Sequence, residues 1–271
     1  MKITIEAGST ERHYWKDLWS YRELFYFLAW RDLLVRYKQT VIGVAWAVLR
    51  PLLTMLALTL VFGKLAKMPS DGVPYPLLVF AALLPWHFFA SSFSEAGNSL
   101  INNTNMISKV YFPRITIPAS SIIVSFVDFL ISLALLALLM LWYGFIPDLR
   151  ILLLPIFTLI AIAASLGGGL WIAALNVKYR DFRYIIPFVV QFGLYVSPVG
   201  FSSSVVPENW RFVYSLNPMV GVIDGFRWVI LGGESELYLP GFLISIVTVV
   251  IVLVTGYIYF RKTEKLFADV I

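Results

Sequence analysis

The stretch that decides the fold is ITIPASSIIVSFVDFLISLALLALLMLWY, residues 115–143, in which Asp128 is the single charged side chain. A helix needs about 20 mostly apolar residues to cross a bilayer, so this segment is long enough to span one. Five further stretches meet the same criterion, at residues 41–63, 75–94, 151–177, 184–206 and 237–260. The sequence therefore predicts an all-α membrane protein with six transmembrane helices.

The composition is typical of a protein that is embedded in a lipid bilayer. Apolar residues make up 59% of the 271 residues and charged residues only 14%. A soluble domain keeps roughly half of its residues polar, so the apolar excess indicates burial in a bilayer. The net charge of +5 indicates basic loops facing the cytosol and not a nucleic-acid partner.

The lysines and arginines of the loops predict the orientation. With the N-terminus inside, fifteen of them fall on the cytosolic side and five on the outer side, while Arg50 lies within a helix. Cytosolic loops carry the excess of basic residues, so both termini are expected in the cytosol. The expected organisation is a cytosolic N-terminus at 1–40, a six-helix domain at 41–260 and a cytosolic tail at 261–271.

The segment at residues 21–38 is apolar in its middle and charged at both ends, and it is too short to span. Its length, its aromatic content and its flanking charges favour a helix lying in the membrane interface. A soluble N-terminal hairpin is the alternative. The sequence shows no cleavable signal peptide.

Several kinds of catalytic and metal site are excluded. The chain has no cysteine, and its two histidines, His13 and His87, lie far apart, so neither thiolate chemistry nor a histidine metal site is expected. The phosphate-binding pattern Gly-x-x-x-x-Gly-Lys-Ser/Thr is absent, and the triplet at 167–169 is expected to serve close helix packing. We therefore expect no catalytic residue, metal or cofactor in this chain. Any ATP and magnesium would be bound by a partner.

Arg50 is the most informative single residue. A charge well inside a span costs about 2.5–3.5 kcal/mol on insertion scales, so Arg50 is expected to face a water-filled path or a partner, with Asp128 as a candidate. Trp46, Arg50 and Thr54 are spaced four residues apart and share one helical face. An arginine that extends to the membrane interface is the alternative.

Aromatic residues make up 16% of the chain. Many are expected to form belts at the membrane interfaces. Trp86, Phe89 and Phe93 share a face of the second span, and Gln191 and Tyr195 lie on the fifth. Rings beside hydroxyl and amide groups suit a ligand with apolar faces and polar edges, such as a sugar, although core packing is the alternative for each ring.

Two short cytosolic loops combine charges with aromatic side chains. Their sequences are KVYFPR at 109–114 and KYRDFR at 178–183. A solvated loop needs no aromatic residue between its charges, so both loops are interpreted as docking sites for another protein. Simple anchoring by positive charge is the alternative.

The segment at residues 207–233 is too apolar for an open loop and too broken by Pro and Gly to span. Asn217-Pro218 is a turn signal between two short apolar segments. Two half-length helices dipping into the outer leaflet fit this pattern, provided that their ends are buried in protein or face water. The chain has no internal repeat, so a wide pathway would need two copies around a two-fold axis.

These motifs in this order resemble the membrane subunit of polysaccharide-exporting ABC transporters, over essentially the whole chain. The matching segments are GVAW at 43–46 with Arg50-Pro51, LPWHFF at 84–89, KVYFPR at 109–114, LNVKYRD at 175–181, SPV at 197–199, and Asn217-Pro218 with FRW at 226–228. Each segment alone is weakly specific, but six in order are specific. A neutral amide is commoner in the family at position 50 and beside Trp86, so Arg50 and His87 are expected to reflect the substrate of this exporter.

The resemblance implies a homodimer in the cytoplasmic membrane of a bacterium or archaeon, paired with two cytosolic ATPase subunits. The implied cargo is a glycan of the O-antigen, capsule or teichoic-acid type, carried on a polyprenyl-diphosphate lipid. Carried over to this chain, the resemblance places coupling elements in the two cytosolic loops and a gate at the outer mouth. The coupling residues would be Lys109, Tyr111, Phe112, Arg114, Lys178, Arg180, Asp181 and Arg183, and the gate would include Asn217, Pro218 and Arg227.

The leading hypothesis is a permease for lipid-linked polysaccharide, driven by a partner ATPase. The substrate pathway would be lined by Trp46, Arg50, Trp86, His87, Phe89, Phe93, Gln191 and Tyr195. An ABC permease for a drug or a small lipid is the first alternative. A membrane-embedded lipid enzyme is disfavoured because the spans hold only Asp128 and His87 as candidate acid–base groups. The glycan and the type of cell envelope are left open.

Overall fold

The computed structural model describes residues 14–38, 43–70, 72–179, 181–232 and 237–267. Within these ranges the regular elements are all helical and no strand occurs. The longer helices are α2 (Arg22–Lys38), α3 (Gly43–Leu58), α4 (Tyr75–Asn102), α6 (Thr116–Trp142), α7 (Leu154–Lys178), α8 (Phe182–Val196), α10 (Pro218–Leu231) and α11 (Leu239–Thr263). Shorter elements are α1 (Tyr14–Ser20), η1 (Thr59–Leu65), α5 (Thr104–Ile107), η2 (Leu149–Leu153), η3 (Ser203–Val205), α9 (Glu208–Tyr214) and η5 (Glu264–Leu266).

Among the described residues, five helical segments are long and apolar enough to cross a membrane. They are Ala45–Leu65, Tyr75–Asn102, Thr116–Trp142, Leu149–Lys178 and Leu239–Leu266. They correspond to five of the six predicted spans and confirm an all-α membrane protein. The first residues of the span predicted at 41–63 lie outside the described ranges.

The span predicted at 184–206 is wrong in its length. Helix α8 has 15 residues, and the backbone is already extended at Ser197. Fifteen residues reach about 22 Å, which is less than the roughly 30 Å of hydrocarbon in a bilayer. The break has a local cause: Pro198 has no N–H to donate and disfavours helical geometry at Ser197. Mean hydropathy hid this break because the following residues remain largely apolar.

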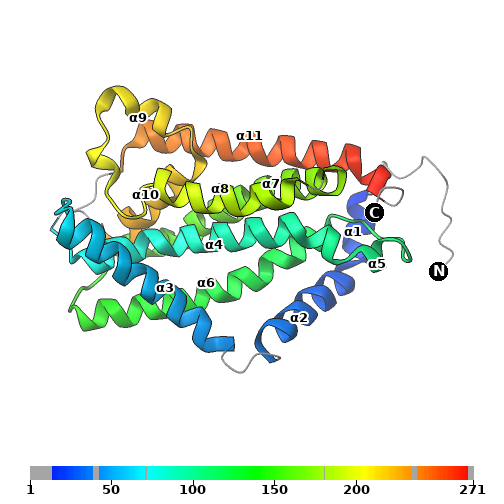
Figure 1. Ribbon diagram of the computed structural model, residues 1–271, viewed down its shortest axis with the longest axis horizontal. Helices are drawn as coiled ribbons and strands as arrows, with labels where there is room; N and C mark the ends of the chain where they lie inside the picture. The colour runs from blue at the N-terminus through cyan, green and yellow to red at the C-terminus, as the bar shows by residue number, and fades with distance from the viewer. Residues whose placement is uncertain (1–13, 39–42, 71, 180, 233–236, 268–271) are drawn as a thin grey trace.

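Helix α4 lies at the centre of the molecule and contacts α3, α6, α7, α8 and α10 (Figure 1). Its residues from Leu77 to Leu84 are almost completely buried. The side chains around it form the larger of two cores, together with buried residues of α6, α7 and α10. A helix that is apolar on all sides needs protein or lipid around it, and α4 obtains mostly protein.

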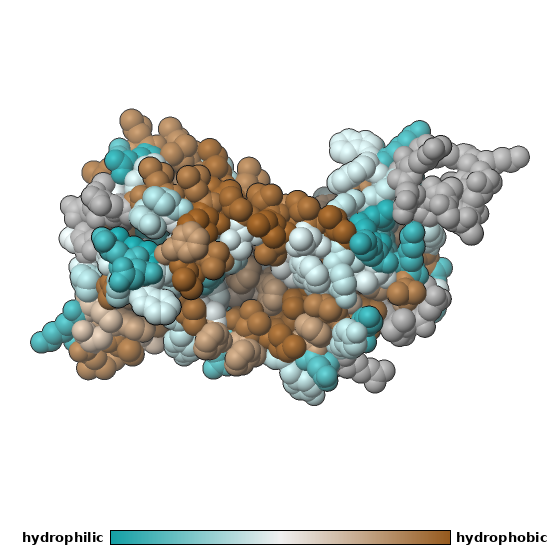
Figure 2. Space-filling model, turned by 90° about the horizontal axis from the view of Figure 1, so that it is seen from above, coloured by the Kyte–Doolittle hydropathy of each residue, from teal (hydrophilic) through white to brown (hydrophobic). Residues whose placement is uncertain are grey.

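The first and last helices meet at one end of the molecule, which we name the α1 end (Figure 1). A second core lies there and joins α1, the loop before α6 and the end of α11 with the residue after η5. Its members include Tyr14, Phe112, Phe260 and Phe267. The opposite end, which we name the α9 end, carries α9 and η1 (Figure 1). Hydrophobic side chains cover the middle of the face seen in Figure 2, and hydrophilic ones gather mainly toward its two ends. This distribution is the one expected of a protein that crosses a bilayer.

The glycine triplet packs helices closely, as predicted. A Cβ added at Gly167 would lie 2.7 Å from backbone atoms of Leu253 in α11, and one at Gly169 would lie 2.7 Å from Ala96 in α4. A Cβ at Gly256 would lie 2.4 Å from the carbonyl oxygen of Gly167. Helices α7 and α11 therefore approach each other along a contact without side chains.

The predicted pair of half-length helices is present as α9 and α10, which are joined at Asn217-Pro218. The side chain of Asn217 accepts a hydrogen bond from the Met219 N–H, and Pro218 occupies the first turn of α10. Both are standard helix-start features. Helix α10 is mostly buried against α4, α7 and α11, so its backbone is sheltered by protein as the sequence required.

Helix α2 occupies most of the segment predicted to lie in the membrane interface. It packs on α6, and its arginine Arg31 donates to the side chain of Asn103 at 2.8 Å. Its outward side exposes aromatic side chains, among them Tyr26, Phe27 and Trp30. Whether this helix lies in the membrane interface stays a prediction. The domain boundaries at residues 40 and 260 stay predictions.

Candidate functional site in a polar cleft

A cleft of about 540 Å³ lies between α2, α3, α4 and α6. Its lining combines charged, hydroxyl and apolar side chains from all four helices. The lining residues are Arg36, Tyr37, Trp46, Ala47, Arg50, Pro51, Leu53, Thr54, Leu84, His87, Phe88, Ser91, Ser125, Asp128, Phe129 and Ser132. A cleft of this size falls within the range of small-molecule binding sites.

Helix α3 contributes one whole face to the cleft. Trp46, Arg50 and Thr54 all line it, which confirms the shared face predicted from their spacing. The Thr54 hydroxyl donates to the carbonyl oxygen of Arg50 at 2.8 Å, one turn back in the helix. Pro51 is buried beside them. Within the described ranges, the guanidinium group of Arg50 makes no ion pair or side-chain hydrogen bond.

Asp128, the candidate partner of Arg50, lines the same cleft but is bound by other residues. The carboxylate of Asp128 accepts a 2.9 Å ion pair from Arg36 and a hydrogen bond from the Tyr37 hydroxyl, both at the end of α2. Burial raises the pKa of the Tyr37 phenol above its ordinary value, and the hydrogen bond to Asp128 raises it further. Tyr37 therefore stays protonated and remains the donor. Arg36 also lies 3.7 Å from Glu95.

Beside the cleft, α4 and α6 each carry a buried polar atom without a hydrogen-bond partner among the described residues. The Nε2 atom of His87 and the hydroxyl oxygen of Ser125, which comes from α6, are buried without a hydrogen-bond partner among the described residues. Both residues line the cleft. Ser91, one turn beyond His87, donates instead to the carbonyl oxygens of His87 and Phe88 within its own helix. Both atoms are fully buried behind the lining, so their hydrogen-bonding capacity is unused by the described residues and is closed off from the open cleft.

The predicted pathway residues do not all meet in this cleft. Trp86 and Phe93 are only 4% and 5% exposed, and their rings pack with Phe89. The Trp86 ring lies against Gly193 of α8, and the Phe93 ring lies against Gly168 of α7. The three rings therefore share one face of α4, as predicted. That face turns toward α7 and α8, whereas His87 faces the cleft, because residues 86, 89 and 93 lie on a different stripe of the helix.

Gln191 and Tyr195 lie on α8 and are exposed. Neither belongs to the lining of the cleft. Their neighbours Phe188 and Phe192 stack on each other with ring centres 5.7 Å apart, also on the exposed side of α8. In the single chain these side chains form an open aromatic face and not part of a closed path.

The first predicted coupling loop is divided between surface and core. Lys109 and Tyr111 are exposed, but Phe112 is 3% exposed and belongs to the core of the α1 end. The expectation of an exposed docking side chain is therefore wrong for Phe112, because its ring is buried in the core that also contains Tyr14 and Phe267. The role of this loop in coupling stays a prediction.

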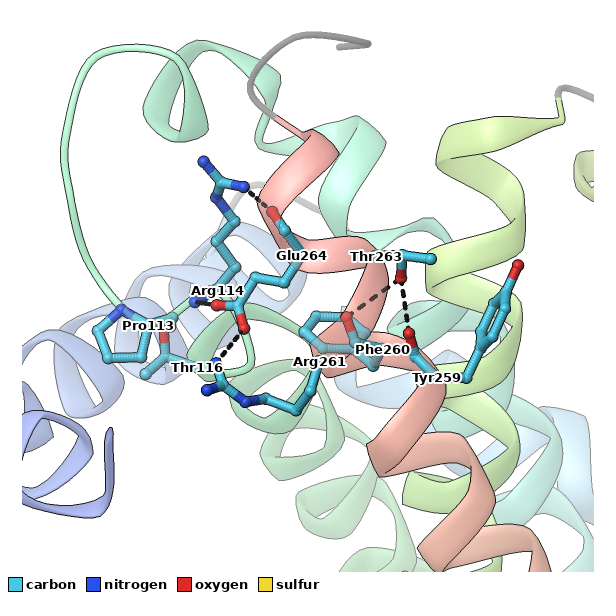
Figure 3. Close-up of polar contacts among 8 residues, drawn as sticks. All are labelled: Pro113, Arg114, Thr116, Tyr259, Phe260, Arg261, Thr263 and Glu264. Carbon is cyan, nitrogen blue, oxygen red and sulfur yellow. Dashed lines mark hydrogen bonds and ion pairs between the residues drawn. The ribbon is translucent and has the colours of Figure 1, made fainter. Parts of the chain in front are cut away.

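Arg114, at the end of this loop, is held by Glu264 of η5 (Figure 3). The backbone N–H of Arg114 donates to Glu264 Oε1 at 2.8 Å, and its guanidinium group donates to the Glu264 backbone carbonyl. Arg261 donates to Glu264 Oε2 at 2.6 Å from the other side (Figure 3). Glu264 itself is 8% exposed. We name Arg114, Arg261, Glu264 and Tyr14 the Glu264 cluster.

Tyr14 completes this cluster from α1. The guanidinium carbon of Arg261 lies 3.4 Å from the centre of the Tyr14 ring, in a cation–π contact. Burial, and then the nearby Glu264 carboxylate, raise the pKa of the Tyr14 phenol above its ordinary value. Only one part of this cluster has a pattern in the sequence: Arg261 and Glu264 are three residues apart and so lie on one helical face. Tyr14 and Arg114 are distant from both in sequence.

The second predicted coupling loop is open to solvent. Lys178, Asp181 and Arg183 are exposed at the end of α7 and the start of α8. Arg180 lies outside the described residues. Val177 packs against the core of the α1 end, so this loop lies at the same end as the first.

Arg227, predicted near the outer gate, is a buried arginine in α10. Its guanidinium group donates to the backbone carbonyls of Leu78, Val199 and Phe201 at 3.2, 3.1 and 2.7 Å. The carbonyls of Val199 and Phe201 lie after the end of α8, so they do not accept the hydrogen bonds of a continuing helix. Asn217 adds a hydrogen bond to the Ser197 hydroxyl at 3.0 Å. The sequence missed this arrangement because Arg227 was counted with the charges of the outer loops.

Comparison with known proteins agrees with this architecture. The family described as ABC-2 type transporter matches residues 23–231. An O-antigen export system permease protein RfbA of Klebsiella pneumoniae is 28% identical over 248 residues, which cover 89% of this chain and 92% of the relative. One of the same name from Myxococcus xanthus is 28% identical over 253 residues, which cover 92% and 96%. The chain therefore belongs to the ABC-2 type transporter family, as a multi-pass inner-membrane subunit of a transporter.

Proposed function

We propose that this chain is the permease subunit of an ABC exporter that moves lipid-linked polysaccharide across the cytoplasmic membrane. The observation that carries the proposal is its alignment with O-antigen export permeases over about nine tenths of both chains. The sequence holds no phosphate-binding loop. ATP and magnesium are accordingly bound by a separate ATPase, and this chain supplies the path and the contacts that receive the motion.

Two copies of the chain and two ATPase subunits form the transporter in this proposal. Support comes from polar and aromatic side chains that the single chain leaves uncovered at the depth of the membrane. Arg50 on α3 and Gln191 on α8 are both exposed, and a charge or amide facing lipid is costly. A second copy would cover these faces and enclose a wet path between them.

The ATPase subunits dock on the α1 end. Lys109 and Tyr111 of the first loop and Lys178, Asp181 and Arg183 of the second are exposed there, which supports this placement. The Glu264 cluster fixes the first loop to α1 and to the end of α11. A movement of the ATPase against the first loop would therefore be transmitted to α1 and α11.

Export of a drug or a small lipid is the second candidate. It is favoured by the burial of Trp86 and Phe93, which leaves a shorter aromatic surface for stacking on sugars than the sequence indicated. The two candidates share the same architecture and differ in cargo.

The test is reconstitution of the chain with its partner ATPase in liposomes. Addition of lipid-linked glycan should raise ATP hydrolysis and move the glycan to the opposite leaflet, where it becomes protected from an added glycosidase. An ATPase variant without its nucleotide-binding lysine is the control and should move nothing. Stimulation by amphiphilic drugs or small lipids but not by glycan would establish the second candidate, and no glycan-dependent hydrolysis or movement would refute the first.

A further inference from the structure

A second pocket, of about 380 Å³, lies at the last turns of α11, at the α1 end (Figure 1). It shares no lining residue with the cleft around Arg50. Its lining residues are Tyr257, Ile258, Arg261, Lys262 and Lys265. Three of these five side chains are cationic and none is acidic, so the pocket attracts a negatively charged group.

One cation of this pocket, Lys262, is exposed and forms no ion pair with the described residues. Arg261 differs, because it donates to the Glu264 carboxylate at 2.6 Å. Glu264 lies outside the lining and is largely buried. Lys265 is exposed three residues after Lys262. Lys262 can therefore receive an anion while Arg261 stays in the Glu264 cluster.

An apolar stripe on α11 leads into the pocket. Its side chains are spaced three or four residues apart, so they lie on one face of the helix, and all of them are exposed in the single chain. They are Leu239, Leu243, Val247, Val250, Val254 and Ile258. The same spacing continues to Lys262 and Lys265. An apolar face that runs along α11 therefore ends in two cations.

The length of this stripe places the pocket at the depth of lipid head groups. The residues from Leu239 to Ile258 extend over about 30 Å, which is the hydrocarbon thickness of a typical bilayer. Lys262 follows one turn later, where the phosphate groups of a leaflet lie. The aromatic side chains agree with this depth. The Tyr257 ring lines the pocket and stacks on the exposed Trp15 with ring centres 6.0 Å apart, and Trp and Tyr are enriched at the membrane–water interface.

Charge and apolar surface together favour a lipid over a soluble anion. A free phosphate or a nucleotide would contact the lysines but would leave the apolar stripe uncovered. An acidic protein segment would do the same. A molecule with an anionic head group and hydrocarbon chains covers both parts, and basic residues at the end of a membrane-spanning helix attract such lipids.

We infer that the end of α11 binds an anionic glycerophospholipid such as phosphatidylglycerol. Its phosphate lies at Lys262 and Lys265, beside Tyr257, and its acyl chains lie along the stripe that ends at Ile258. This lipid belongs to the surrounding bilayer and is not the exported cargo. The inference rests on the proposed function only for naming this leaflet the cytosolic one.

The test uses the full chain with its partner ATPase, purified in detergent. Native mass spectrometry would compare the binding of dioleoyl phosphatidylglycerol with that of dioleoyl phosphatidylcholine, which has the same chains and no net charge. We expect phosphatidylglycerol to bind at least about fivefold more tightly, the effect of one basic residue near an anionic lipid. Equal binding of the two lipids would overturn the inference. Displacement of phosphatidylglycerol by glycerol 3-phosphate at the same concentration would show a site for soluble anions and would also overturn it.

Variants locate the site on α11. Lys262→Gln combined with Lys265→Gln should remove the preference for phosphatidylglycerol, whereas Arg at both positions should keep it. Lys64→Gln combined with Lys67→Gln removes the same charge from exposed positions at the α9 end and should also keep it. A common melting temperature in phosphatidylcholine would show that all variants are folded. An equal preference in the two Gln variants would overturn the site.

Further outcomes separate the inference from a protein contact and from the proposed function. Loss of the ATPase from the variant with Gln at 262 and 265, with its lipid preference unchanged, would identify a protein contact and overturn the lipid assignment. Glycan-dependent ATP hydrolysis by a wild type without preference for phosphatidylglycerol would refute the inference and leave the export function in place. A preference that depends on the two lysines, in a complex that never responds to glycan, would support the inference and refute the export of glycan.

Discussion

Arg227 is a buried side chain that supplies hydrogen bonds to backbone carbonyls in a segment that is not helical. The chain leaves helical geometry at Ser197 while still among buried residues, so the backbone carbonyls of Val199 and Phe201 are no longer part of a helix. The guanidinium group of Arg227 donates to three backbone oxygens, two of them in this segment. Non-helical backbone at membrane depth is tolerated only where protein or water satisfies it. Arg227 provides that satisfaction here.

Replacement of Arg227 by Gln should lower the free energy of unfolding by about 3 kcal/mol, since hydrogen bonds to charged groups contribute about 1.5–3 kcal/mol each and Gln keeps only some of them. Thermal unfolding in detergent, followed by tryptophan fluorescence, would measure the change. Arg211→Gln is the matched control. Among the described residues, the Arg211 guanidinium donates to the nearby carbonyls of Ser204 and Val206 and lies 5.7 Å from the centre of the Tyr238 ring. Equal melting temperatures for the two variants would contradict the assigned role.

At the scale of single residues, the sequence predicted types of environment better than partners. The cost of a charge in a span correctly placed Arg50 beside a polar cleft, and the spacing of Trp46 and Thr54 placed them with it. The partner of Asp128 could not be predicted, because it depends on how α2 packs against α6. Residues distant in sequence, such as Arg114 and Glu264, gave no pattern that links them.

Helices α7 and α11 depend on glycine for their contact. Gly167 and Gly256 lie where any side chain would meet backbone atoms of the opposite helix. Backbone cannot move aside as a flexible side chain can. Gly167 therefore cannot be replaced without moving backbone, whereas Gly168 faces a side chain. We expect the two neighbouring glycines to differ in how much an added methyl group destabilises the protein.

Gly167→Ala should destabilise the protein by about 1–3 kcal/mol, as expected when a methyl group is forced into a packed contact. Gly168→Ala is the control, since its Cβ would lie 3.1 Å from the movable ring of Phe93 and would not reach backbone. Both variants would be compared with the wild type by thermal unfolding in detergent. A Gly168→Ala variant as unstable as Gly167→Ala would show that the backbone contact is not what matters.

At the scale of elements, the long spans were predictable and the breaks were less so. Uninterrupted apolar runs predicted both ends of α6, α7 and α11 and the start of α4 to within about three residues. Helix α4 continues to Asn102, beyond the predicted end at residue 94. The length of α8 was overestimated because mean hydropathy does not register that Pro198 ends a helix. The Asn217-Pro218 turn, by contrast, was recognised from its two residues, because their capping geometry is local.

The Glu264 cluster connects three segments that lie far apart in sequence. It binds α1, the loop before α6 and the end of α11 through one carboxylate and one cation–π contact (Figure 3). Glu264 and Arg261 are both largely buried, at 11% and 21% side-chain exposure, so their pairing is less weakened by water than a surface ion pair. The α1 end therefore behaves as one assembled unit.

Glu264→Ala should free the loop at residues 109–114 and make it a better substrate for trypsin, which cuts after Lys109 and Arg114. We expect cleavage there to be several times faster than in the wild type, because proteases act on segments that open locally. Mass spectrometry of the fragments would identify the sites. Glu208→Ala, at an exposed position of α9, should leave the rate unchanged, and an unchanged rate in Glu264→Ala would show that Glu264 does not hold the loop.

For the whole molecule, composition and charge predicted a multi-pass membrane protein. They could not show that the predicted pathway residues lie in different places, with Arg50 and His87 at the cleft and Gln191 and Tyr195 on the open face of α8. This separation depends on the rotation of each helix about its own axis, which hydropathy does not specify. It makes the cleft the feature on which the account most depends.

The most direct test asks whether this cleft contains water in the assembled transporter. The chain has no cysteine, so single-cysteine variants at Thr54 and Ser91, which line the cleft, each give one reporter. A membrane-impermeant maleimide, which reacts with the hydrated thiolate, should label both in at least one nucleotide state of the transporter. Leu138→Cys, at an exposed apolar position of α6, should stay unlabelled. Cleft positions as unreactive as position 138 in every nucleotide state would contradict the account.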